Sequence, residues 1–486
     1  MDRTRKAAVE ESIPDGGSDA GAILEMSALQ LARAIREGRL DPIRVLEVHI
    51  ARIRAVNPSL NALVAERFER ARDDAEQAAR AVAKGDGLAP LHGVPVTVKD
   101  ALPVAGLPFT GGLSTRSNVI ADEDAEAVSR LRSAGAIVLG KTNTPELCAS
   151  VETHNHLYGR TRNPWDLDRT PGGSSGGEAA LIAAGGSPLG LGSDLAGSLR
   201  IPAAFCGIAA LKPTANRIPT EGHFPADPPG LEGWNTVGPL ARHVEDLALA
   251  YSVLTGTELD LTGGFEVATR VVIPRYPSGW SVSDPVREAV ERAAQTLADE
   301  GLEFQDEANL ALDDVAYEFA VRLHRAWLPV LTDHLGAGGS LGLALRFPAA
   351  VLGLGSTSVN TLASLLMVAL MGGQLRRRGY GQGGLQALRA SVLEHIGPGG
   401  LIVWPAVGSV APRHGLPYGL TSGTVFSGVF NALGMPAAVV PVGRSKQGLP
   451  IGVQVAGSPG AEELVLAAAA QLEAAHGGFR PPPLEL

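Results

Sequence analysis

Two stretches of the chain determine its fold class: residues 94–98, VPVTV, and residues 124–140, DAEAVSRLRSAGAIVLG. The first is a short run rich in β-branched residues, which is typical of a buried strand. The second begins as an amphipathic helical pattern that ends at Gly135, and it continues as AIVLG, another apolar strand candidate. Alternation of strand, helix and strand predicts an α/β fold.

Residues 135–142, GAIVLGKT, also match G-x-x-x-x-G-K-[ST], the pattern of a phosphate-binding P-loop. A P-loop follows a strand and directs its backbone N–H groups at phosphates. Here the interior residues Ala136 to Leu139 are apolar and form the expected strand themselves, so they cannot also form the loop. We therefore interpret the match as accidental and expect Lys141 to have a structural role.

The composition of the 486-residue chain indicates a globular protein, with 45% hydrophobic and 19% charged residues. A net charge of −10 argues against nucleic acid as a partner. The two cysteines, Cys148 and Cys206, argue against a disulfide framework and favour a cytoplasmic location. His154 and His156 lie near Cys148, but no HExxH or paired CxxC spacing supports a metal site.

Two segments bear on membrane association. Residues 1–20 lack the apolar region of a signal peptide and are predicted to form a flexible tail. Residues 347–373 carry no charge, but Pro348 and several glycine and polar residues interrupt them. Their apolar core, LASLLMVALM, has about half of the ~20 residues that a span needs. We predict no membrane span, and either a buried helix or the apolar wall of a substrate channel.

The remaining pattern indicates one catalytic domain, residues 21–486. Residues at about 310–395 contain apolar helices and glycine runs without clear alternation, and we expect them to form a variable helical substrate-binding region. The other elements expected are a helix opened by the capping box Ser27–Gln30, a helix after Asp41-Pro42, a helix capped by Asp284, and strands at 401–407 and 437–442.

Residues 159–177, GRTRNPWDLDRTPGGSSGG, are predicted to form a loop that launches a helix at 178–184. Within the loop, residues 172–176 match G-x-S-x-G, the nucleophile elbow of α/β-hydrolases. That motif requires a strand before it and a helix after it. Only the helix is expected here, so the elbow interpretation fails one of its two tests.

A hydrolase nevertheless fits the segment that follows. Ser198 stands in DLAGS, a turn of small residues that lets backbone amides approach a carbonyl oxygen. Lys99 ends an apolar strand, where a desolvated ammonium loses its proton more easily. Each feature alone has an ordinary explanation, because glycine runs usually form turns and a terminal lysine usually lies in solvent. Only their combination favours catalysis.

Seven motifs resemble the amidase signature family of hydrolases, in the order expected for it, from about Ser27 to Glu473. The serine-rich core is especially similar to the fatty acid amide hydrolase branch, although we expect no counterpart of that branch's membrane anchor. The resemblance implies an α/β fold with a central mixed twisted β-sheet covered by helices on both faces. The motifs are GVPVTVKD, GAIVLGKTNTPE, RNPWD, GGSSGG, GSDLAGSLRIPAAFCG, LKPT and FNALGMPAAVVPVG with GLPIGVQVAG.

The resemblance also implies a catalytic triad. By position, Ser198 is the nucleophile, Ser174 is the bridging serine, and Lys99 is the base. The family has a cis peptide bond before the bridging serine. Lys99 would take a proton from Ser174, and Ser174 would take one from Ser198, which attacks the carbonyl carbon.

The same resemblance assigns supporting roles. The backbone N–H groups of Leu195, Ala196, Gly197 and Ser198 correspond to the family's oxyanion hole, and the backbone at Cys148 faces the substrate. Ala196 replaces the first glycine of the family's Gly-Gly-Ser pattern. We expect that this position does not need a positive φ and that the methyl group narrows the acyl side of the pocket. Residues expected to support the site without taking part in chemistry are Ser175, Asp194 and Arg200.

The resemblance implies an amidase that hydrolyses linear C–N bonds, needs no metal or organic cofactor, and acts as a monomer or homodimer. Leu341 to Met371 favour a small-molecule substrate with a hydrophobic acyl or aryl group, and amides, esters and carbamates (urethanes) all remain candidates. One alternative is the glutaminase-type A subunit of a glutamyl-tRNA amidotransferase. The residues after LKPT, ANRIPTEGHFP, depart from that branch's tyrosine-glycine-arginine pattern. Another is a catalytically inactive binding protein of the same fold.

Overall fold

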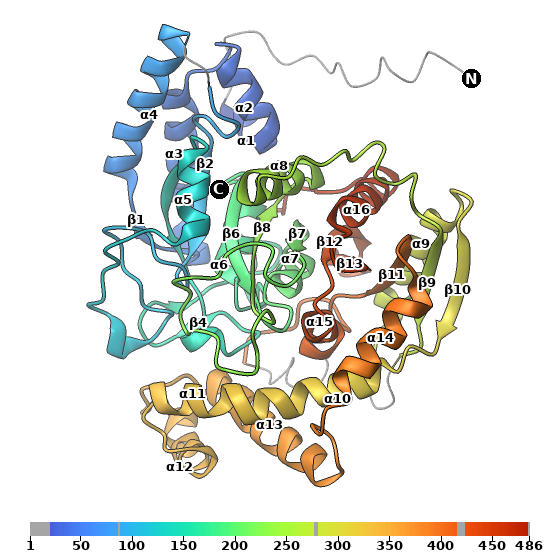
Figure 1. Cartoon of the computed structure of the whole chain (residues 1–486). Helices are drawn as coiled ribbons and strands as arrows, with labels where there is room; N and C mark the ends of the chain where they lie inside the picture. Colours follow the sequence, from blue (N-terminus) through green and yellow to red (C-terminus); the bar gives the residue numbers. More distant parts are fainter. Residues whose placement is uncertain (1–19, 86–87, 277–279, 416–422, 485–486) are drawn as a thin grey trace.

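A computed structural model describes residues 20–85, 88–276, 280–415 and 423–484. The expected tail, residues 1–20, lies outside this part of the chain except for Ala20. Within it, an eleven-stranded mixed sheet has the strand order β1-β3-β2-β6-β8-β7-β12-β13-β11-β9-β10, and β4 and β5 form a separate pair (Figure 1). The strands are β1 Leu63–Glu66, β2 Pro95–Lys99, β3 Ile137–Thr142, β4 His154–Asn155, β5 Gly159–Arg160, β6 Leu189–Asp194, β7 Ala209–Lys212, β8 Thr236–Ala241, β9 Arg270–Pro274, β10 Glu303–Ala308, β11 Gly400–Pro405, β12 Ala437–Arg444 and β13 Pro450–Gly457.

The stretch that predicted the fold class forms a parallel strand–helix–strand unit. β2 pairs in parallel with β3, and α5 connects them. β2 also pairs in parallel with β6, whereas β6 to β13 are joined by antiparallel pairs. Because parallel neighbours present their carboxyl ends at one edge, the ends of β2 and β6 meet there. The expected mixed sheet is confirmed.

Helices cover both faces of this sheet because its strands are apolar on both sides. In β3, Ile137 and Leu139 pack into one core, whereas Val138 between them packs into the other. The Ile137 side is covered by α3 Pro42–Leu60, α4 Phe68–Lys84, α6 Gly176–Ala183 and α7 Arg200–Cys206. The Val138 side is covered by α2 Ala28–Arg36, α5 Glu126–Ser133, α8 Val244–Thr255, α9 Asp284–Ala298 and α16 Glu462–His476.

The helix starts follow local capping chemistry. Ser27 caps α2 through a complete capping box with Gln30, as predicted. Asp41 caps α3, and its side chain accepts a hydrogen bond from Ile43 N–H. The predicted cap at Asp284 is wrong by one position, since Ser283 has the extended cap conformation and Asp284 is the first residue of α9. Its carboxylate still lies in the first turn, where the helix dipole favours negative charge.

The predicted variable region is helical. Its helices are α10 Leu312–Arg322, a π-helical turn at Leu323–Trp327, α11 Leu328–His334, α12 Ser340–Val351, α13 Val359–Arg377 and α14 Leu385–Ile396. In Figure 1, α10 to α13 lie together at the bottom of the view, beneath the sheet. The two remaining helices are α1 Ala20–Glu25 and α15 Gly423–Ala432.

The uncharged stretch 347–373 is divided between α12 and α13. Leu362 and Leu365 of α13 are buried, whereas Met367 and Met371 line a cavity described below. The stretch therefore supplies both core and cavity wall. Within the described ranges, no helix combines the length and apolarity needed to cross a bilayer.

Lys141 lies in β3, within the accidental P-loop match, and is fully buried. Its ammonium donates to Leu102 O at 2.6 Å and Pro108 O at 3.2 Å, and it pairs with Asp100 Oδ1 at 3.1 Å. Asp100 also accepts hydrogen bonds from the backbone N–H and the hydroxyl of Thr110. All three donor positions of the ammonium are used, so Lys141 has the structural role that the sequence predicted.

Replacing Lys141 with Met should lower the free energy of unfolding by about 3–5 kcal/mol, because Asp100 would remain buried without its cation. Urea unfolding followed by circular dichroism measures this change. Lys84→Ala is the control, since Lys84 is exposed at the end of α4 and its replacement should change stability by less than about 0.5 kcal/mol. Equal unfolding curves for Lys141→Met and the wild type would contradict the role assigned to this ion pair.

Candidate active site

The site lies where β2 and β6 end. Lys99 is the last residue of β2, and Ser193 and Asp194 are the last two of β6. The strands are parallel neighbours, with Val98 level with Leu191, so their terminal side chains are close together. The sheet thus brings Lys99 next to a segment that lies 94 positions later in the chain.

Lys99 is fully buried, and its polar contacts are hydroxyl and carbonyl groups. Nζ lies 2.7 Å from Ser174 Oγ, 3.0 Å from Ser193 Oγ and 3.4 Å from Ser193 O. Burial lowers the pKa of Lys99, and the nearby acidic groups only partly oppose this effect. Burial therefore shifts Lys99 towards the neutral amine, which is the form a general base requires.

Ser174 and Ser175 occupy the end of the glycine-rich loop, directly before α6. The peptide bond between Gly173 and Ser174 is cis. Ser174 is fully buried and faces Lys99. Ser175 supports the loop from behind, since its N–H donates to Ser198 O at 3.1 Å and its hydroxyl donates to Ser193 O at 3.3 Å.

Ser198 lies in the turn between β6 and α7, on the boundary between two cavities. The larger, of about 110 Å³, is mainly apolar, and the smaller, of about 20 Å³, also contains Ser174. In the part of the chain that is described, no hydrogen bond joins the hydroxyls of Ser198 and Ser174. Such contacts are often long before substrate binds. Residues shared by both cavities are Cys148, Ser198 and Trp327.

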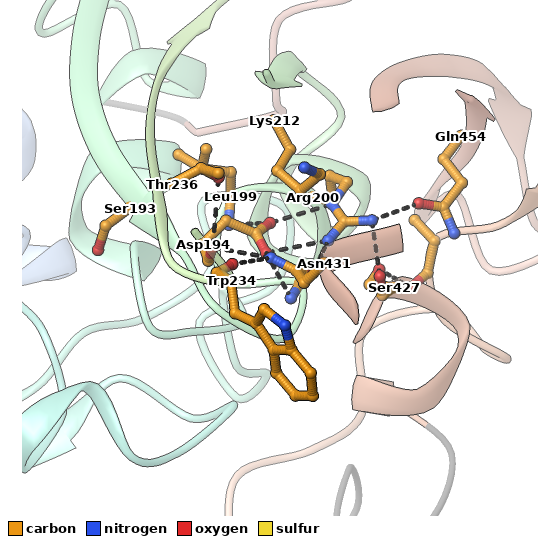
Figure 2. Close-up of polar contacts among 12 residues, drawn as sticks. Ser193, Asp194, Leu199, Arg200, Lys212, Trp234, Thr236, Ser427, Asn431 and Gln454 are labelled. Carbon is orange, nitrogen blue, oxygen red and sulfur yellow. Dashed lines mark hydrogen bonds and ion pairs between the residues drawn. The ribbon is translucent and has the colours of Figure 1, made fainter. Parts of the chain in front are cut away.

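A buried ion pair fixes the turn that carries Ser198. Arg200 Nε and Nη2 donate to the two carboxylate oxygens of Asp194 at 3.0 and 2.9 Å, and both side chains are fully buried (Figure 2). The rest of the guanidinium donates to Ser427 O, Gln454 Oε1 and Asn431 Oδ1. Burial raises the pKa of Asp194, but the charge and hydrogen bonds of Arg200 hold it well below its usual range. Asp194 and Arg200 thus contact the turn that carries Ser198 without lining either cavity, at positions where we expected them to support the site.

The backbone conformation of this turn explains why position 197 requires glycine whereas position 196 accepts alanine. Gly197 has φ 103°, and a Cβ there would lie 2.6 Å from Ser427 Cβ, so glycine is required. Ala196 has no positive φ, and it lines the larger cavity, as the sequence predicted. The N–H of Gly197 donates to Asp194 Oδ1 at 2.7 Å. Within the described residues, no acceptor is found for the N–H groups of Leu195, Ala196 and Ser198.

Cys148 lines both cavities, and Leu147 and Cys148 both have positive φ, 58° and 55°. Its thiol lies 3.4 Å from Thr144 Oγ1. Burial alone would raise the pKa of this thiol, but Lys99 and His223, when charged, lower it to about 6. Cys148, whose backbone was expected to face the substrate, thus lies in the wall of both cavities.

Three residues of the site were not identified from the sequence. Ser193 contacts Lys99, His223 contacts Ser193, and Trp327 closes both cavities from the π-helical turn. Ser193 directly precedes Asp194 in the motif GSDLAGS, which is the signal that could have identified it. His223 and Trp327 come from segments without a local pattern. As for metals, the described residues contain no group of three His, Cys, Asp or Glu side chains that could hold an ion.

The family profile described as "Amidase" matches residues 44–324 and 384–466 of this chain. The unmatched residues between these segments fall within the helical region at about 310–395. The matched segments include every predicted site residue, from Lys99 to Arg200.

Individual relatives cover nearly the whole chain. It is 33% identical over 490 residues to fatty-acid amide hydrolase 2-A of Danio rerio, covering 95% of this chain and 90% of that protein. It is 33% identical over 473 residues to indoleacetamide hydrolase of Bradyrhizobium diazoefficiens, covering 93% and 87%. Among solved structures, 6-aminohexanoate cyclic dimer hydrolase has a TM-score of 0.77 and 30% identity, covering 95% of this chain and 99% of that one.

Iodoacetamide should alkylate Cys148 and spare Cys206, which is fully buried and whose pKa is raised by burial. The rate at Cys148 should rise between about pH 5 and 7 and then level off, because its thiol pKa is about 6. Peptide mass spectrometry measures both rates in one sample. Equal labelling of the two thiols, or a rate at Cys148 that still rises above about pH 8, would contradict this description.

Proposed function

Because the chain belongs to the amidase signature family, we propose that it hydrolyses linear amide C–N bonds through Ser198, Ser174 and Lys99. The protein is a hydrolase of carbon–nitrogen bonds other than peptide bonds, as its motifs predicted. The main support for this mechanism is the hydrogen bond of 2.7 Å between buried Lys99 and Ser174. Ser174 and Ser198 line the same cavity beside this bond.

In the proposed reaction, neutral Lys99 accepts the proton of Ser174 while Ser174 accepts the proton of Ser198. Ser198 Oγ forms a bond to the carbonyl carbon, and the carbonyl electrons move to oxygen. Collapse of this intermediate breaks the C–N bond, and Ser174 returns a proton to the leaving nitrogen. Water then attacks the acyl-enzyme by the same route, which releases the acid and restores Ser198.

The developing oxyanion is stabilised by backbone donors. The N–H groups of Leu195, Ala196 and Ser198 suit this role, because they lack an acceptor among the described residues. Gly197 belongs to the same turn, but its N–H already holds Asp194, so its contribution is to keep the turn in shape. Fixed donors of this kind contribute strongly because they need no reorganisation during the reaction.

The preferred substrate has a hydrophobic acyl or aryl group. The larger cavity is lined by Phe319, Leu323, Trp327, Met367, Val368 and Met371, together with small residues near Ser198. The named relatives act on a fatty-acid amide, indoleacetamide and a cyclic dimer of 6-aminohexanoate, according to their names, and these differ in size. We assign the selection of acyl groups to the helices at about 310–395, and esters and carbamates remain candidates for the same chemistry.

The helical region is fixed to the catalytic region through Glu146. Its carboxylate accepts hydrogen bonds from Ser358 N–H at 3.0 Å, Ser358 Oγ at 2.7 Å and Thr361 Oγ1 at 2.7 Å, all at the start of α13. Glu146 lies two residues before Cys148. The start of α13, and hence its cavity-lining methionines, is thereby held in register with the cavity wall at Cys148.

Ser198→Ala should abolish turnover of an aryl amide, and Ser174→Ala and Lys99→Ala should each lower kcat/KM by several orders of magnitude. High pH should partly restore Lys99→Ala, because hydroxide replaces the missing base. A fluorophosphonate probe should label the wild type at Ser198 and leave Ser198→Ala unlabelled. Ser117→Ala, an exposed serine, is the matched control and should retain full activity.

Two results would contradict the triad. Turnover by Ser198→Ala at the wild-type rate would exclude Ser198 as nucleophile, and absence of labelling in the folded wild type would favour the inactive binding protein. Release of ammonia from glutamine, with no activity on hydrophobic amides, would favour the glutaminase-type subunit.

For p-nitroanilides of increasing acyl length, kcat/KM should rise about fourfold per methylene until the cavity is filled, since each buried methylene contributes about 0.8 kcal/mol. Met371→Gln should flatten this rise and leave the acetyl substrate unaffected. Leu370→Gln is the matched control, because Leu370 is 63% exposed on the same helix. Preference for short polar amides, or equal effects of the two variants, would contradict the assignment of the acyl pocket.

A further inference from the structure

Lys99 has a second hydroxyl partner, and that partner is connected to a histidine. Ser193 Oγ lies 3.0 Å from Lys99 Nζ and 2.8 Å from His223 Nε2. The other ring nitrogen, Nδ1, lies 2.9 Å from Pro225 O. His223 is 9% exposed and lines the smaller cavity together with Ser174 and Ser198. A continuous chain of polar contacts therefore runs from His223 to the amine that faces Ser174.

The position of each proton in this chain follows from donor and acceptor chemistry. The carbonyl of Pro225 can only accept, so His223 Nδ1 carries a proton. In the neutral ring, Nε2 is then the acceptor, and the hydroxyl of Ser193 donates to it. Ser193 Oγ is left to accept an N–H from Lys99.

This arrangement fixes the orientation of neutral Lys99. A neutral amine has two N–H bonds and one lone pair. One N–H points to Ser193 Oγ and the other to Ser193 O, both acting as acceptors. The lone pair is therefore directed at the third partner, Ser174 Oγ, whose proton it must take in the proposed reaction.

We propose that His223 is a positioning residue which, through Ser193, keeps the lone pair of Lys99 directed at Ser174, and that protonation of His223 switches the base off. When Nε2 is protonated, it donates to Ser193, so the hydroxyl of Ser193 must turn and donate to the lone pair of Lys99. An N–H of Lys99 then faces Ser174, and Ser174 can no longer be deprotonated. The inference rests on the proposed role of Lys99 as base.

Other titratable groups face the series of polar contacts that runs from His223 through Ser193 to Lys99. Asp227 and Cys148 line the same cavity as His223. Burial raises the pKa of Asp227, and the charge of His223 only partly opposes this effect. Burial also acts to raise the pKa of the Cys148 thiol, but Lys99 and His223, when charged, lower it. Cys148, Asp194 and Glu178 lie near Lys99 and favour its charged form. Among these groups, only His223 is bonded to the hydroxyl that contacts Lys99, so only its protonation should reverse the donor order.

The test is the acid side of the pH profile of kcat/KM, which reports the free enzyme. In the wild type, protonation of either Lys99 or His223 inactivates the enzyme, so the limiting slope of log kcat/KM against pH should approach 2. In His223→Gln only Lys99 remains, and the slope should be 1, whichever way the amide is oriented. At a pH one unit below the start of this acid limb, each enzyme retains a fraction of its maximum kcat/KM. The fraction retained by His223→Gln should be about ten times the fraction retained by the wild type. KM should change little compared with kcat.

Ser193→Ala provides a second variant, because it removes the connection and retains the histidine. Its acid slope should also be 1, and adding His223→Gln to it should cause no further change in slope. Cys148→Ala and Asp227→Asn are the matched controls for the neighbouring groups and should retain the slope of 2. Circular dichroism across the pH range excludes acid unfolding as the source of either slope.

An acid slope that is the same in the wild type, His223→Gln and Ser193→Ala would overturn the inference. A slope that falls in Cys148→Ala would overturn it as well, since the second proton would then belong to the thiol. These results leave the proposed function intact, because turnover would still depend on Ser198. Turnover by Ser198→Ala at the wild-type rate would instead remove the proposed function, and with it the premise that Lys99 is the base.

Discussion

The proposed catalytic arrangement depends on burying an amine where no carboxylate pairs with it. The first half of the sheet shows the contrast, because Lys99 and Lys141 are both fully buried on neighbouring strands. Lys141 is paired with Asp100, which favours its ammonium form. Lys99 contacts the hydroxyls of Ser174 and Ser193, and within the described residues it forms no ion pair. Since a charged group pays a large desolvation cost without a counter-ion, Lys99 is the lysine of the two that is suited to act as a base.

The charge of one nearby carboxylate, Asp194, is compensated so that it opposes the effect of burial on Lys99 less strongly. Asp194 follows Ser193 directly, and its charge does favour the ammonium of Lys99. However, both of its oxygens are held by Arg200 and by the backbone of the Ser198 turn. The ion pair therefore has two effects at once: it fixes the turn that carries Ser198, and it compensates a carboxylate whose charge favours the ammonium form of Lys99.

The sequence predicted what local patterns encode. The β2–α5–β3 unit, the capping box at Ser27, the helix at Asp41-Pro42 and the structural role of Lys141 all follow from residues close together in the chain. Lys99 and Ser198 were candidates from their local sequence, but Ser174 and the joining of the three into a triad came only from the family resemblance, because no local pattern shows that strand ends 94 positions apart meet. The edge strand β10, with sequence EFQDEA, was missed because its exposed residues show no apolar alternation.

The least predictable features are hydrogen bonds that depend on the tertiary fold. The family resemblance assigned the N–H of Gly197 to an oxyanion hole, but only the structure shows that this N–H is already bonded to Asp194. His223 lies in a proline- and glycine-rich loop, and its partner Ser193 is 30 positions earlier. Neither spacing nor periodicity connects them, since a side chain from a loop can face any strand end that the fold places beneath it.

The two cavities beside Ser198 determine how a substrate would be oriented in the proposed reaction. A hydrophobic acyl group gains free energy only in the larger cavity, where Trp327 and the methionines of α13 replace water. The leaving nitrogen must then lie on the opposite side of the carbonyl, towards the smaller cavity that holds Ser174 and His223. That is also the side on which it needs a proton and from which water must attack the acyl-enzyme. One boundary residue, Ser198, thus separates the part of the site that selects the acyl group from the part that transfers protons.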